Sequence, residues 1–274
     1  MASFSINGTT IFYTFYEKAG APVLLFSNSL GTDHQMWNDQ VEVLKQKYSI
    51  LLYDTRGHGQ SGTTPGEYSI ALLAGDVLDL LDYLKIDRVI FCGLSMGGLI
   101  GQWLGIYFPT RLHKLVVCNT AVKIGSVTSW NERIIQVFDQ GLNHLSKATI
   151  QRWFTPSFVD QHPLLVNRII MSFLSCSSRG YISCCAAVRD ADFTADVHEI
   201  RVPTLVIAGE QDPVTTVEDG KKLAEKIPQA EFITLPAAHL SVVEAGSVFT
   251  NVLRNFIDGN YVGQSLPKKE DTRV

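Results

Sequence analysis

The pattern Gly-x-Ser-x-Gly at residues 93–97 constrains the fold of this chain more than any other feature. An apolar run at 88–92 precedes it, and an apolar run compatible with a helix, 99–108, follows it. This is the strand–turn–helix context that holds a serine above the edge of a sheet. The two glycines leave space where a Cβ would clash with the neighbouring strand or helix. The pattern therefore predicts that Ser95 lies in a strained turn, at the partially positive N-terminus of a helix.

Strand and helix signals alternate along both ends of the chain. Asn7-Gly8 lies between the first two apolar runs and predicts a hairpin turn. Alternation of this kind implies right-handed crossovers and a mostly parallel, eight-stranded α/β sheet with helices on both faces. Strands are predicted at 4–6, 11–16, 22–26, 49–53, 88–92, 114–118, 204–208 and 231–235, and helices at 35–46, 69–84, 99–108, 217–226 and 242–258.

The alternation stops between residues 125 and 190. Helices are predicted there at 131–141, 146–154 and 163–188, and no strand signal interrupts them. We therefore expect a helical cap, 125–190, inserted into a core formed by 1–124 and 191–262. The last residues, 263–274, are expected to form a polar tail.

Composition limits the function classes. With 274 residues, 46% of them hydrophobic, the chain can form one large α/β domain. A net charge of −4 does not indicate a nucleic-acid or membrane-surface partner. No secretory signal is expected at the N-terminus, and no apolar run of about eighteen residues predicts a membrane span.

The five cysteines favour a cytoplasmic protein. Cys92 and Cys118 fall in predicted core strands, and the other three fall in the helical region. Buried, reduced thiols are typical of this placement. Cys184 and Cys185 are adjacent, and adjacent cysteines rarely form a comfortable disulfide.

A reactive serine needs a base to accept its proton, and the base needs an acid to orient it. In an open α/β sheet such groups gather at the carboxyl ends of the strands. Asp212 follows the strand 204–208, and His239 follows 231–235. The order Ser95, Asp212, His239 is the order expected for this arrangement. Glu210 is the alternative acid, and His34 is the alternative histidine.

An oxyanion formed at Ser95 would need two backbone donors. The first is the N–H of Met96, directly after the serine. The second should come from the loop that follows the strand 22–26, and we expect the N–H of Leu30. No zinc-like spacing of Cys and His is present, so neither a metal nor another cofactor is expected.

The chain resembles the α/β-hydrolase superfamily over nearly its whole length, and most closely the 3-oxoadipate enol-lactonases of aromatic catabolism. Most relatives have His-Gly where this chain has Asn28-Ser29, a pair that is typical of the lactonases. The run Ala-Ala-Val-Arg-Asp-Ala-Asp-Phe that ends at Phe193 is similarly specific. The segments that carry the resemblance are 27–33, 54–61, 93–98, 119–121 and 184–193.

The resemblance implies hydrolysis of a five-membered enol-lactone with a carboxymethyl arm, giving 3-oxoadipate in the β-ketoadipate pathway. The partners would then be a small anionic lactone and water. A chain of net charge −4 needs a local cation for such a substrate. Arg133 and Arg189 are the candidates, with Trp130 and Trp153 as pocket walls. Core packing for each tryptophan and a surface ion pair for each arginine are the competing interpretations.

Other functions remain open. The same three side chains could serve a general carboxylesterase or a cofactor-free haloperoxidase-like perhydrolase. A hydrolase fold can also serve as a non-catalytic ligand receptor, because fold does not determine function. The sequence leaves the oligomeric state open.

Overall fold

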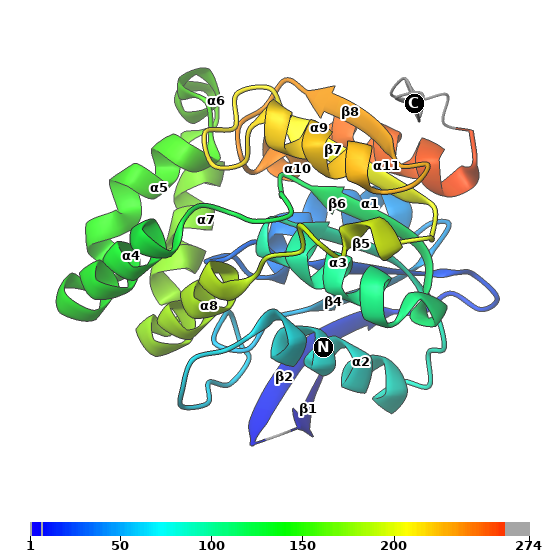
Figure 1. The fold of residues 1–274 in the computed structure, drawn as a ribbon, viewed down its shortest axis with the longest axis horizontal. Helices are drawn as coiled ribbons and strands as arrows, with labels where there is room; N and C mark the ends of the chain where they lie inside the picture. Colours follow the sequence, from blue (N-terminus) through cyan, green and yellow to red (C-terminus); the bar gives the residue numbers. More distant parts are fainter. Residues whose placement is uncertain (1, 7, 261–274) are drawn as a thin grey trace, which may run out of the picture.

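The computed structural model describes residues 2–6 and 8–260 of the chain. Asn7 of the predicted hairpin turn and the predicted tail 263–274 lie outside the described residues. The strands form one sheet in the order β1-β2-β4-β3-β5-β6-β7-β8 (Figure 1). They are β1 (Ala2–Ile6), β2 (Thr9–Tyr16), β3 (Val23–Ser27), β4 (Ser49–Tyr53), β5 (Val89–Leu94), β6 (Leu112–Cys118), β7 (Thr204–Gly209) and β8 (Glu231–Leu235).

The sheet is mostly parallel, as the sequence predicts. β2 pairs antiparallel with β1 and β4, and every other neighbouring pair is parallel. β4, β5 and β7 are buried at every position, which is typical of strands covered on both faces. The carboxyl ends of β3, β5, β6, β7 and β8 therefore meet at one edge of the sheet.

Helices cover both faces of the sheet (Figure 1). On one face lie α2 (Ile70–Tyr83), α3 (Met96–Tyr107) and α9 (Val217–Lys226). On the other, α1 (Asn38–Leu44) packs against α11 (Gly246–Asp258). Ser69 caps α2 by accepting a hydrogen bond from the N–H of Leu72, as its sequence position predicts.

The segment between β6 and β7 is helical and lies beside the sheet, at the left of Figure 1. We refer to this group of helices as the cap. Its members are α4 (Val127–Gln140), the 3₁₀ turn η3 (Leu142–Leu145), α5 (Ser146–Trp153), α6 (Pro156–Gln161), α7 (Pro163–Ser175) and α8 (Ser178–Asp190).

The predicted helix 163–188 is wrong, because the chain breaks it into α7 and α8. Ser177 adopts extended backbone and caps α8 by accepting a hydrogen bond from the N–H of Gly180. A serine side chain that bonds the local backbone competes with continuation of a helix. The sequence analysis also missed α6, where Thr155 is the N-cap and Pro156 the first helical residue.

Other helix boundaries also differ from the prediction. α4 begins at Val127 because Ser126 and Ser129 form a reciprocal capping box. The predicted helix 242–258 is divided at Ala245 into α10 (Ser241–Glu244) and α11. The predicted helix 35–46 begins as the 3₁₀ turn η1 (His34–Trp37) before α1. In residues 2–6 and 8–260 no helix combines the length and the apolar character that crossing a bilayer requires.

A buried ion pair anchors the loop that follows β4. The guanidinium of Arg56 donates to both carboxylate oxygens of Asp76 on α2, and both side chains are only 2% exposed. The same guanidinium bonds Thr64 and lies 5.5 Å from the ring centroid of Tyr68. The pair therefore ties the loop to α2.

We predict that Asp76→Ala lowers the free energy of unfolding by about 3–5 kcal/mol, because it leaves a buried guanidinium unpaired. The control is Asp82→Ala, which breaks the ion pair of a partly buried Arg111 with an exposed carboxylate. That change should cost about 1 kcal/mol or less. Urea denaturation of the two variants measures the difference, and equal losses would contradict the prediction.

Candidate active site

Ser95 occupies the turn between β5 and α3, and its backbone is strained. Its φ is 58° and its ψ is −112°, values that few residues other than glycine adopt. A Cβ on Gly93 would lie 2.2 Å from the carbonyl oxygen of Gly97, and a Cβ on Gly97 would lie 2.3 Å from that of Ser27. Both glycines of the motif are therefore required by the close approach of β3, β5 and α3.

His239 and Asp212 meet at the ends of β8 and β7. Nδ1 of His239 lies 2.8 Å from Oδ2 of Asp212, and both residues are buried. Burial of the Asp212 carboxyl opposes ionisation, but the charge and hydrogen bond of His239, together with bonds from Asn119 and Val214, lower its pKa. The carboxylate is therefore held ionised beside the imidazole, with the Nδ1–H pointing at it.

Asn119 joins the two loops, a role that sequence reasoning missed. Its side-chain amide donates to Asp212 Oδ2 at 2.9 Å and to the carbonyl of Ala238 at 3.2 Å. Its Oδ1 accepts a hydrogen bond from Ser241. The residue has a φ of 45°, which asparagine tolerates better than most residues. An asparagine directly after a predicted core strand, at the same edge as Asp212 and His239, was the available signal.

The structure separates the two alternative residues from this pair. Glu210 is exposed and accepts a hydrogen bond from Thr234. His34 pairs through Nδ1 with Asp54 at 2.8 Å. Asp212, not Glu210, is the carboxylate that contacts His239.

The loop after β3 turns tightly at Leu30 and Gly31. Asn28 anchors its base by donating to the carbonyl of Tyr53 and by accepting from the indole N–H of Trp37. The carbonyl of Ser29 accepts from both the N–H and the hydroxyl of Thr32. In the part of the chain that the structure describes, the N–H groups of Leu30 and Met96 have no hydrogen-bond acceptor. The two predicted oxyanion donors are thus unused by the protein itself.

One cavity brings the core and cap residues together. Ser95, His239 and Leu30 line it from the core, and its walls include Trp130, Arg133 and Trp153 from the cap. Trp130 is fixed by the bond of its indole N–H to the carbonyl of Ile124, at 2.7 Å. The remaining lining residues are Ser29, Ile124, Thr149, Arg152, Tyr181, Val188 and Val214.

Two guanidinium groups line this cavity. The guanidinium of Arg133 lies 4.9 Å from the ring centroid of Trp130. Arg152, which the sequence analysis did not single out, bonds the hydroxyl of Thr149. Burial lowers the pKa of Arg152, and the positive charge of Arg133 lowers it further. Among the described residues neither arginine forms an ion pair with a carboxylate.

The structure does not bring Arg189 to this cavity. Its guanidinium forms ion pairs with Glu67 and Asp190 instead, and Arg189 does not line the cavity. It also donates to Asn131 of α4. Arg189 is therefore occupied by a surface network, which was one of the two interpretations that its sequence position allowed.

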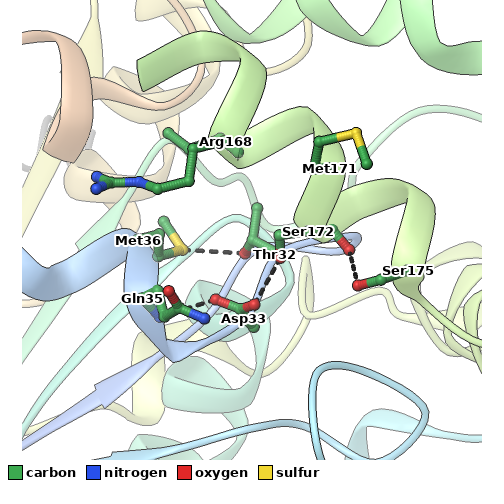
Figure 2. A pocket seen from close by; sticks show the side chains of 9 residues that line it. Thr32, Asp33, Gln35, Met36, Arg168, Met171, Ser172 and Ser175 are labelled. Atoms are coloured by element: carbon green, nitrogen blue, oxygen red, sulfur yellow. Dashed lines mark hydrogen bonds between the residues drawn. The ribbon is translucent and has the colours of Figure 1, made fainter. Parts of the chain in front are cut away.

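A second cavity, of about 190 Å³, lies between the loop after β3 and α7 (Figure 2). Asp33 at its base accepts hydrogen bonds from Ser172 and from the N–H of Gln35. None of Ser95, Asp212 and His239 lines it. Within residues 2–6 and 8–260, no group of three or more His, Cys, Asp or Glu side chains could hold a metal ion.

Comparison with known proteins identifies the superfamily of this chain. The family model described as serine aminopeptidase, S33 matches residues 31–239. The crystal structure of the enol-lactonase from Burkholderia xenovorans LB400 is similar, with a TM-score of 0.92 and 39% identity, over 94% of this chain and 100% of that chain. The chain belongs to the α/β-hydrolase superfamily.

Its curated relatives narrow the family. The chain is 45% identical over 241 residues to 3-oxoadipate enol-lactonase 2 of Acinetobacter baylyi, which is 88% of this chain and 90% of that protein. It is 40% identical to 3-oxoadipate enol-lactonase 1 of the same organism, over 92% of this chain and 94% of that protein. Within the superfamily, the chain belongs to the family of the 3-oxoadipate enol-lactonases.

His58 stabilises the Leu30–Gly31 turn through a hydrogen bond. Its Nε2 accepts a hydrogen bond from the N–H of Gly31 at 2.9 Å, so its proton lies on Nδ1, which faces the carbonyl of Arg56. Burial lowers the pKa of His58, although the Arg56 carbonyl and the charges of Asp54 and Asp33 oppose this. The imidazole is therefore held neutral, and a protonated Nε2 could not accept from Gly31.

We predict that His58→Gln makes the free energy of unfolding depend less steeply on pH between 7 and 5. Because the pKa of His58 is lower in the folded state, its contribution is complete above about 6.5 and is lost as the pH falls below that value. Glutamine supplies a carbonyl acceptor for Gly31 but does not titrate. Urea denaturation at pH 5, 6 and 7 measures the slope, and an unchanged slope would refute the prediction. His34 is present in both proteins and cancels from the comparison.

Proposed function

We propose that this protein opens 3-oxoadipate enol-lactone to 3-oxoadipate through an acyl-enzyme on Ser95. The observation that carries the proposal is the cavity in which Ser95 and His239 face Arg133 and Arg152. It combines groups suited to acyl transfer with two guanidinium groups suited to a substrate carboxylate. Relatives at 45% and 40% identity that are 3-oxoadipate enol-lactonases support the choice of substrate.

Ser95 Oγ attacks the lactone carbonyl while Nε2 of His239 accepts the hydroxyl proton. Asp212 holds the imidazole in the tautomer that leaves Nε2 free, because it accepts the Nδ1–H. The N–H groups of Leu30 and Met96 stabilise the negative oxygen of the tetrahedral intermediate. The ring C–O bond then breaks, and the imidazolium returns its proton as the enol oxygen departs.

The ring oxygen leaves on the same molecule, since the acyl group and the leaving group of a lactone are joined. The enol tautomerises to a ketone, which makes ring closure unfavourable. Water then attacks the acyl-enzyme, with His239 again as the base, and releases Ser95 and a second carboxylate. The product therefore carries one more negative charge than the substrate.

The carboxymethyl arm of the substrate would lie against Arg133 and Arg152. Two cations placed side by side repel one another, and an anion between them relieves that repulsion. Trp130 holds Arg133 in place through its ring face. The cap thus selects an anionic lactone, whereas the core residues act on any ester that reaches them.

The proposal includes the division of the chain into a core, 1–124 and 191–262, and a cap, 125–190. The core would carry the groups that act on the ester, and the cap would carry those that recognise the arm. We also propose a cytoplasmic location. The five cysteines are unpaired and buried, as is common where thiols stay reduced.

Turnover of the enol-lactone, with 3-oxoadipate identified as the product, tests the proposal directly. Ser95→Ala should lower kcat about a millionfold, because loss of the nucleophile disables the whole group. Glu210→Gln is the matched control, since this exposed carboxylate contacts Thr234 rather than His239. A Ser95→Ala variant that kept a tenth of the wild-type rate, with circular dichroism unchanged, would sink the acyl-enzyme mechanism.

The substrate carboxylate should depend on both cavity arginines. Arg133→Met or Arg152→Met keeps an apolar stem and removes the charge, and each should lower kcat/KM for the lactone at least tenfold, about 1.4 kcal/mol. Hydrolysis of neutral phenyl acetate should change by no more than about threefold. Arg189→Met, on the cap but outside the cavity, should leave both substrates unaffected. Equal losses on the two substrates would mean that the arginines only support the cap.

A further inference from the structure

One corner of the cap touches the chain on both sides of His239. The corner is the α5–α6 junction, Trp153–Thr155. The N–H of Leu240 donates to the carbonyl of Trp153 at 3.0 Å. On the other side of the histidine, the N–H of Ala238 donates to Oε2 of Glu244 at 2.8 Å. Glu244 in turn accepts from Thr155, so both neighbours of His239 are connected to the same corner.

Glu244 is the link between the two segments. Its Oε1 accepts from the hydroxyl of Thr155, and both of its carboxylate oxygens lie within 3.4 Å of the Thr155 amide nitrogen. It lies at the end of α10, five residues after His239, and is half-buried. Among the described residues it forms no ion pair with a lysine, arginine or histidine. Its carboxylate thus accepts from three donors, the N–H of Ala238 and the N–H and hydroxyl of Thr155. Hydrogen bonds to a charged acceptor are stronger than those between neutral groups.

The corner also carries a wall of the cavity. The indole of Trp153 lines the cavity beside His239, and its ring packs edge-on against Phe173 at 5.6 Å. The free volume of the cavity is about 30 Å³, whereas a single water needs roughly 10–15 Å³. A five-membered lactone with a carboxymethyl arm is larger, so the cavity must widen to admit it.

We infer that Glu244 is a positioning residue that couples the cap to the catalytic histidine through Thr155. It holds the Trp153 wall and the His239 loop as one unit while the rest of the cavity widens. This inference rests on the proposed function for its natural substrate, but the coupling itself concerns only Ser95, His239 and the cap. It is therefore measurable with a reagent that is not a lactone.

A double-mutant cycle on Glu244 and Thr155 tests the coupling. Glu244→Gln keeps the shape but supplies one acceptor oxygen in place of two. Thr155→Val removes the hydroxyl, which is both the donor to Glu244 and the N-cap acceptor of α6, and keeps the volume. Each should lower kcat/KM for the lactone by about three- to tenfold. The kcat/KM of the double variant should lie within about twofold of the kcat/KM of the less active single variant. The reason is that either single substitution already breaks the hydrogen bond between Glu244 and Thr155.

The same cycle is measured with diethyl 4-nitrophenyl phosphate. This neutral reagent forms a bond from phosphorus to Ser95 Oγ, releases 4-nitrophenolate, and passes the serine proton to His239. Its rate constant for inactivation should show the same non-additivity. The cycle of Glu244→Gln with Thr149→Val is the matched control, since Thr149 lies on α5 and bonds Arg152 instead. Its effects should be additive.

The outcomes are distinct. Additive losses for Glu244 and Thr155 in both assays would overturn the inference and leave the proposed function intact. Lower melting temperatures with unchanged rate constants would overturn it as well, because Glu244 would then only stabilise the fold. The wild-type protein could fail to hydrolyse the lactone while the inactivation rate constants of the organophosphate cycle are non-additive. That result would refute the proposed substrate and support the coupling.

Discussion

The close approach of three main-chain segments around Ser95, from β3, β5 and α3, is the constraint on which the rest of the site depends. The strained φ of 58° at Ser95 costs on the order of 1–3 kcal/mol. It persists because several hydrogen bonds and close contacts hold the backbone in this conformation. The N–H of Ser95 bonds the carbonyl of Cys118, and its carbonyl accepts from Thr120. The N–H of Gly97 donates to the carbonyl of Asn28, at the start of the loop after β3. The position of the serine, the direction of α3 and the place of that loop are thus set together.

A second junction, at Asn119, connects the ends of three other strands. Asn119 follows β6 and bonds Asp212 after β7 and Ala238 after β8. A Cβ on Gly209 would lie 2.4 Å from the Ala238 carbonyl oxygen, so the loops approach as closely as at Ser95. The positions of Asp212 and His239 therefore depend on the packing of the two loops. The side chains themselves add only the hydrogen bond between them.

The cap contributes charge rather than reactive groups. α4 and α5 each direct one arginine into the cavity, while the arginine near the end of α8 is held at the surface by Glu67 and Asp190. This division explains how a chain of net charge −4 can line one cavity with two cations. The local arrangement of two arginines matters there, and the net charge of the chain does not.

The sequence by itself determined the sheet, the position of Ser95 in its turn, and the pairing of Asp212 with His239. These depend on local physics: apolar periodicity, turn residues, and the rule that parallel strands bring their carboxyl ends to one edge. Only the tertiary structure decided that Arg152 rather than Arg189 enters the cavity, and that Glu244 joins the cap to the His239 loop. The rotation of each cap helix and the break at Ser177 depend on packing between segments far apart in the chain. Sequence periodicity marks which residues lie on one face of a helix, but not which neighbour that face will meet.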